Sequence, residues 1–123
     1  MFRFYALIAA ILGALSVAIG AFAAHGITDP DAKSLIQTGA HYHFMHVMAA
    51  IAALIFWRWG ARRARFAPPL FFAGVCLFSG SLYALAFGAP HWAGAITPIG
   101  GLLFLAGWGV LAWAALSLAE PPA

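Results

Sequence analysis

Long stretches without a charged side chain are the feature that most restricts how this chain folds. No Asp, Glu, Lys or Arg occurs from Phe4 to Ala24, and none occurs from Phe66 to Ala119. Charged residues make up 7% of the chain, whereas a soluble domain carries about 25%. Because nine formal charges are too few to cover a water-facing surface, we expect lipid to surround most of the chain.

The apolar runs predict an all-α membrane protein, an antiparallel four-helix transmembrane bundle that forms one domain over residues 1–123. Asp29-Pro30 and Thr97-Pro98 are typical helix starts, in which a capping side chain precedes a proline. The connections are short, which favours antiparallel neighbours. The predicted spans are about 2–24, 40–57, 69–87 and 98–118, with an amphipathic segment at about 30–39.

The first apolar run follows Arg3 and so resembles a secretory signal peptide. Its length, from Phe4 to Ala24, exceeds the apolar region of about 7–15 residues in such a peptide, so we expect a retained first helix. Cys76 is the single cysteine and lies in an apolar run, which excludes an internal disulfide and suggests a packing residue.

The basic residues predict an orientation. Arg3 and the four arginines between the second and third spans lie at one end, and Lys33 lies at the other beside two aspartates. Under the positive-inside rule, both termini and the Arg58–Arg65 loop are therefore cytoplasmic. The net charge of +3 does not indicate nucleic-acid binding, because the arginines gather in a membrane loop rather than on a folded face.

Small residues predict where the helices approach closely, since lipid gives little hydrophobic drive between helices. In the first helix one repeat contains Ala6, Ala10, Ala14 and Ala18, and others contain Gly13, Ser16 and Gly20. We expect this helix to pack tightly inside the bundle. Gly100 and Gly101 predict a close-packed face on the fourth helix.

Polar residues inside the spans are candidates for function, because they are costly in lipid unless they have partners. Tyr42 and His46 lie four residues apart on one helix face. We expect His25, Tyr42 and His46 to meet in the outer half of the bundle, with Tyr83 completing the set. The full candidate cluster, which is either structural or ligand-binding, is His25, Thr38, Tyr42, His46, Ser79, Ser81, Tyr83 and Thr97.

The same residues argue against catalysis and metal binding. His43 and His46 could share a cation, but His41 points elsewhere and no acidic residue lies in any span. For the same reason no Ser/His/Asp set can be assembled. We expect no metal, no cofactor and no enzymatic activity.

Several motifs, in order along nearly the whole chain, closely resemble the domain of unknown function 423 family, which is similar to the transmembrane protein 256-like proteins of eukaryotes. The matching segments are Gly20–Gly26, Thr38–His46, Phe78–Tyr83, Thr97–Gly101 and Gly107-Trp108. The resemblance implies a small four-span inner-membrane protein with no established activity. It also implies that the polar cluster and Pro98 are family motif positions.

Three functions remain open at this point. The first is a structural or accessory membrane protein that self-associates or docks on a larger complex. The second is an oligomeric transporter or channel for a small solute or proton, although no acidic residue lies in a span to couple protons. The third is a lipid- or quinone-binding protein, in which Tyr42 and His46 hold a polar head.

Overall fold

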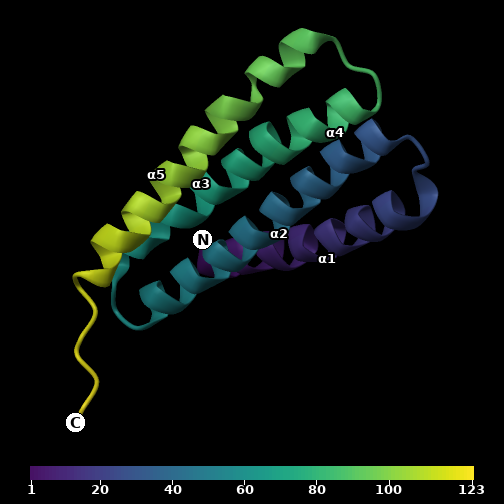
Figure 1. Cartoon of the computed structure of the whole chain (residues 1–123). Coiled ribbons are helices and arrows are strands. Elements are labelled where there is room, and N and C mark those ends of the chain that lie inside the picture. Colours follow the sequence, from purple (N-terminus) through teal and green to yellow (C-terminus); the bar gives the residue numbers. More distant parts are fainter.

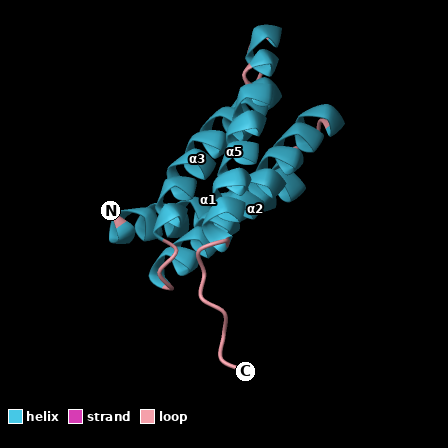
Figure 2. Ribbon diagram, turned by 90° about the vertical axis from the view of Figure 1, so that its left-hand side faces the viewer, coloured by secondary structure: helices cyan, strands magenta, loops and turns pink.

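The computed structural model describes all 123 residues and consists of helices and connections only (Figures 1 and 2). The α-helices are α1 (Phe2–Gly26), α2 (Pro30–Arg58), α3 (Ala67–Gly74), α4 (Gly80–Ala86) and α5 (Thr97–Ala115). A π-helical turn, Val75–Ser79, joins α3 to α4, and 3-10 helices precede α3 (Arg62–Phe66) and α5 (His91–Ala95). The chain thus forms four long helical segments.

All four segments are long and apolar enough to cross a membrane: Phe2–Gly26, Pro30–Arg58, Arg62–Ala86 and His91–Ala115. Consecutive segments run antiparallel and pack together (Figure 1). The structure therefore confirms the predicted all-α, four-helix fold. The third segment begins earlier than expected, because the 3-10 helix at Arg62 precedes the two prolines of α3.

Helix α2 is one continuous helix, which includes the predicted amphipathic segment. The Asp29 side chain accepts a hydrogen bond of 2.9 Å from the backbone N–H of Ala32, and Pro30 occupies the first helical position. Its 29 residues extend about 43 Å, which is longer than a bilayer core of about 30 Å. The first turns of α2 therefore rise beyond the hydrocarbon.

The helices lie in the spatial order α1, α2, α3–α4, α5, with α2 and α3–α4 in the middle (Figure 1). Helix α2 contributes ten buried residues, whereas α1 buries only Ala9, Ser16 and Ala23. Expecting α1 inside the bundle was wrong. It packs on α2 with one face, because those three residues repeat every seven positions and form a narrow seam.

The two small-residue repeats of α1 therefore face different ways. Gly13 lies against Val47, Gly20 lies against Ala40, and Ser16 is buried. These three predicted packing residues belong to the α1–α2 contact. The other repeat is turned away from the bundle, with Ala10, Ala14 and Ala18 exposed.

The contact between the third and fourth segments interlocks phenylalanines with glycines. A Cβ atom on Gly74 would overlap the ring of Phe104, and one on Gly107 would overlap the ring of Phe71. A Cβ on Gly100 would collide with the backbone of Phe78, whereas one on the adjacent Gly101 would only touch the Phe78 ring at 3.9 Å. Gly100 is therefore the closest point of approach, and Gly101 lies beside it.

Candidate functional site

A hydrogen bond between two side chains joins α2 to α4. His43 Nδ1 lies 3.0 Å from the hydroxyl oxygen of Tyr83, and the His43 side chain is buried. The other ring nitrogen of His43, Nε2, is also buried and has no hydrogen-bond partner. One ring nitrogen of His43 is thus hydrogen-bonded to Tyr83. The other faces α1, near the backbone of Leu12.

A second hydrogen bond reinforces the same contact. The Ser79 hydroxyl donates to the backbone carbonyl of Gly39 at 2.7 Å, and both residues are buried. Gly39 also leaves room for Tyr83, because a Cβ at this position would lie 2.6 Å from Tyr83 Cε1. Gly39, Ser79, His43 and Tyr83 therefore form one interlocked set, which we call the α2–α4 polar contact.

Ser81 and Thr97 join α4 to α5. Their hydroxyls share a short hydrogen bond, and the Ser81 hydroxyl also reaches the backbone carbonyl of Phe78 at 2.8 Å. Ser79 and Ser81 are only two residues apart but serve different neighbours, α2 and α5. Two positions along a helix are about 200° apart, so Ser79 and Ser81 face opposite sides of the third segment.

His46 is held within its own helix and by aromatic rings. Its Nδ1 lies 2.7 Å from the backbone carbonyl of Tyr42, so Nδ1 must carry the proton that is donated. The ring of His46 stacks on the ring of Phe104, with centroids 3.5 Å apart. The ring of Tyr42 is nearly parallel to that of His46, with centroids 6.1 Å apart. A histidine in this arrangement is a packing residue with one satisfied donor.

The structure does not bring His25 to the other members of the predicted cluster. His25 is exposed at the end of α1, which lies at the level of Lys33, because Lys33 Nζ contacts the carbonyl of Ala24 at 3.4 Å. His46 lies thirteen residues further along α2, or about 20 Å of helix. The prediction placed His25 too close to His46, because it did not count the length of α2 between its start and His46.

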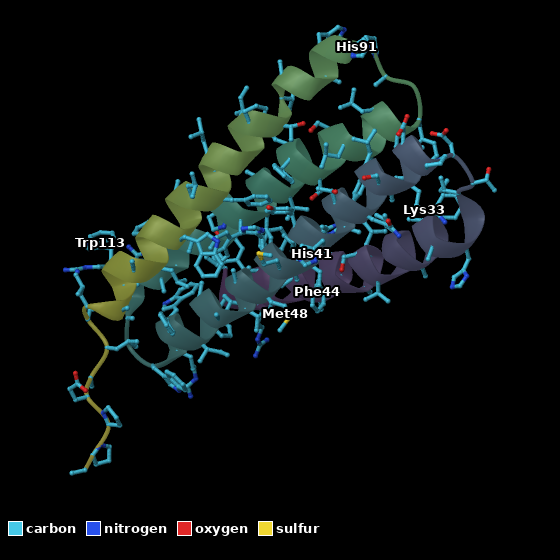
Figure 3. All side chains as sticks on the ribbon, in the orientation of Figure 1. Lys33, His41, Phe44, Met48, His91 and Trp113 are labelled. Carbon is cyan, nitrogen blue, oxygen red and sulfur yellow. The ribbon has the colours of Figure 1, made fainter.

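The remaining candidates are divided in a similar way. Tyr83 pairs with His43 rather than with Tyr42 or His46, and Thr38 is exposed. His41 is exposed on the same side of α2 as Phe44 and Met48 (Figure 3). The three clustered histidines therefore point to different surroundings, and His43 and His46 do not share a site.

His43 is the residue that the sequence reasoning missed. A single helix wheel assigned one polar face to α2, but α2 has neighbours on two sides and buries both faces. A signal was present: Ile36, His43 and Ala50 are seven residues apart, the same spacing as the buried residues of α1. Matching heptad positions on two consecutive helices indicate a shared seam.

Four long apolar helices, joined by buried hydrogen bonds between neighbours, define a small integral membrane protein with a packed interior. The profile of the protein of unknown function family DUF423 matches residues 19–101. The chain belongs to this family, which confirms the resemblance.

Relatives in distant organisms cover nearly the whole chain. A UPF0382 membrane protein of Haemophilus influenzae is 44% identical over 112 residues, which are 89% of this chain and 90% of the relative. The UPF0382 inner membrane protein YgdD of Escherichia coli K12 is 36% identical over 120 residues, 94% and 92% of the two chains. A UPF0382 membrane protein of Schizosaccharomyces pombe is 34% identical over 113 residues, 85% and 94% of the two chains. No solved structure matches.

Proposed function

We propose that this protein is a structural or accessory protein of the inner membrane, without enzymatic activity, that self-associates or docks on a larger membrane complex through the outer face of α1. The inner-membrane assignment follows the Escherichia coli relative, which is named as an inner membrane protein. Both termini and the arginine loop are cytoplasmic in this proposal, because five basic residues lie at that end.

The observation that carries the proposal is the outward face of α1. Ala10, Ala14 and Ala18 are exposed at four-residue intervals. Small residues at this spacing let two membrane helices approach closely, and dispersion contacts then stabilise the pair. The face that packs on α2 is separate, so a partner helix would not disturb the fold.

The chemistry of the interior supports an accessory role over catalysis. Asp29 and Asp31 lie at the start of α2 and Glu120 lies in the tail, so no carboxylate reaches the spans. His43 is engaged by Tyr83, and His46 donates to a backbone carbonyl. No serine or cysteine nucleophile is paired with either histidine.

The packing also argues against a conducting path. Beyond His46, towards the arginine loop, α2 buries only apolar side chains such as Ala49, Ala50, Ala53 and Leu54. The three alanines belong to a contiguous core with Phe71, Phe72 and Leu111. A polar relay that begins at His43 therefore has no continuation towards that end.

Site-directed photocrosslinking tests the proposal. In a Cys76→Ser background, Ala14→Cys would carry a benzophenone group. Leu105→Cys, at an exposed position of α5, would carry the same group as the matched control. We expect a protein adduct from position 14 in native membranes, at twice the chain mass or with one partner, and its loss when Ala18→Leu is added. Lipid adducts alone from both positions would contradict the proposal.

A further inference from the structure

A groove lies where the beginning of α1 packs on the end of α2. It has a volume of about 340 Å³. The residues that line it are Phe2 and Ala6 from α1, and Ile51, Leu54, Ile55, Arg58 and Trp59 from α2. The α2 residues follow the spacing of one helix face, so the groove runs along the helix axis and opens outward.

The lining changes in character along the groove. Arg58 and Trp59 lie at the end of α2 and are exposed. Ile55 and Ile51 follow one and two turns deeper in the bilayer, with Ala6 facing them across the groove. A cation and a tryptophan ring at the headgroup level, above an aliphatic channel, follow the polarity of a phospholipid from phosphate to acyl chain.

The charges around the groove favour an anionic lipid. Arg3, Arg62, Arg63 and Arg65 lie at the same end of the molecule. Arg63 lies over the Trp113 ring at 4.6 Å and Arg65 lies over the Phe66 ring at 4.8 Å, whereas Arg58 has no such partner. The one acidic residue at this end of the molecule is Glu120. It lies on the C-terminal tail, whose residues line a different pocket, together with Trp59. Arg58 is therefore a free guanidinium beside an apolar groove.

We propose that this groove binds one anionic glycerophospholipid, with its phosphodiester on the Arg58 guanidinium and an acyl chain along Ala6, Ile51 and Ile55. The planar guanidinium donates two parallel hydrogen bonds to phosphate oxygens, which an ammonium group does not match. The Trp59 ring lies at the level of the glycerol esters. This lipid site uses Ala6 but none of Ala10, Ala14 and Ala18, so it does not depend on the proposed association.

Native mass spectrometry from nanodiscs tests the site. The discs would contain equal amounts of phosphatidylglycerol and phosphatidylethanolamine with identical acyl chains. We expect the protein to retain one phosphatidylglycerol in preference to phosphatidylethanolamine. Arg58→Gln should lower this retention about fivefold. Arg62→Gln removes the same charge from an exposed residue that lines no groove, and should leave retention unchanged.

A second pair of variants tests the groove and leaves the arginine in place. Ala6→Leu would fill the groove and should also reduce phosphatidylglycerol retention. Ala73→Leu, at an exposed position of α3 outside the groove, should not. A benzophenone amino acid at Ile55 should crosslink to lipid. Equal losses in Arg58→Gln and Arg62→Gln, equal retention of both lipids, or a protein adduct from Ile55 would each overturn the proposal.

Discussion

His43 and Tyr83 bind each other across the contact between α2 and α4, with 3.0 Å between His43 Nδ1 and the tyrosine oxygen. The two residues are forty positions apart in sequence. This is the only side-chain hydrogen bond that the buried ring makes. Its loss leaves His43 Nδ1 without a partner in the interior.

Tyr83→Phe tests the energy of that contact. Removing the hydroxyl should lower the free energy of unfolding by about 0.6–1.7 kcal/mol, which runs from the average to the largest value measured for hydrogen bonds between membrane helices. Tyr42→Phe is the matched control, because Tyr42 holds His46 through its backbone carbonyl, which phenylalanine keeps. Denaturant unfolding in mixed micelles would measure both. Equal losses in the two variants would contradict the assignment.

Gly39→Ala should destabilise the same contact by displacing the tyrosine ring. The new methyl group would lie 2.6 Å from Tyr83 Cε1, next to the Ser79 backbone carbonyl, so the helices must separate or the ring must turn. Overpacking of this kind costs about 1–3 kcal/mol. Gly80→Ala in α4 meets nothing within 4 Å and should be neutral or slightly stabilising. Thermal unfolding in detergent would separate the two variants, and matching melting temperatures would refute the close approach.

Gly100 and Gly101 should respond differently to alanine, although they are adjacent. A Cβ on Gly100 would collide with the backbone of Phe78, which cannot turn aside as a side chain can. A Cβ on Gly101 would make an ordinary contact of 3.9 Å with the Phe78 ring. We expect Gly100→Ala to lose about 1–3 kcal/mol and Gly101→Ala to remain near wild type. If Gly101→Ala were the more damaging change, the close approach of Gly100 to the Phe78 backbone would be wrong.

Cysteine labelling in intact cells should establish the orientation. In a Cys76→Ser background, Ser34→Cys at the exposed start of α2 should react with an impermeant reagent from outside. Arg62→Cys in the exposed arginine loop should react only after permeabilisation. Ala64 is unsuitable for this test because it is fully buried against Ala61 and Ala114. External labelling at Arg62→Cys would reverse the proposed topology.

The helices were predictable because their signals are local. Run length, the Asp29-Pro30 start and the absence of charge are properties of consecutive residues, and they predicted the four long apolar helices. Ser79, Ser81, Tyr83 and Thr97 were also recognised as polar residues in apolar surroundings. All four reach their partners through a hydroxyl group.

The pairing of those residues was not predictable, since it depends on which faces of α2 are covered. Helix α2 turns His43 towards Tyr83 of α4 and His46 towards Phe104 of α5, whereas a single-face wheel keeps only one of the two histidines. His25 was misplaced because proximity in sequence was taken for proximity in depth. Hydropathy reports that a residue is in the membrane, and it does not report which helix lies beside it.

The π-helical turn at Val75–Ser79 amounts to one extra residue in the third segment, since its hydrogen bonds reach one position further than those of an α-helix. A bulge of one residue lets the parts of the helix on either side keep the phase of an uninterrupted α-helix, so removing Cys76 or Leu77 would close the turn with little rotation of α4. Removing Gly80 instead would rotate the rest of α4 by about 100° relative to α3. Ser81 would then leave Thr97 although Ser79 kept its place over Gly39. The turn is therefore a place where the third segment tolerates a change in length while α4 keeps both of its neighbours.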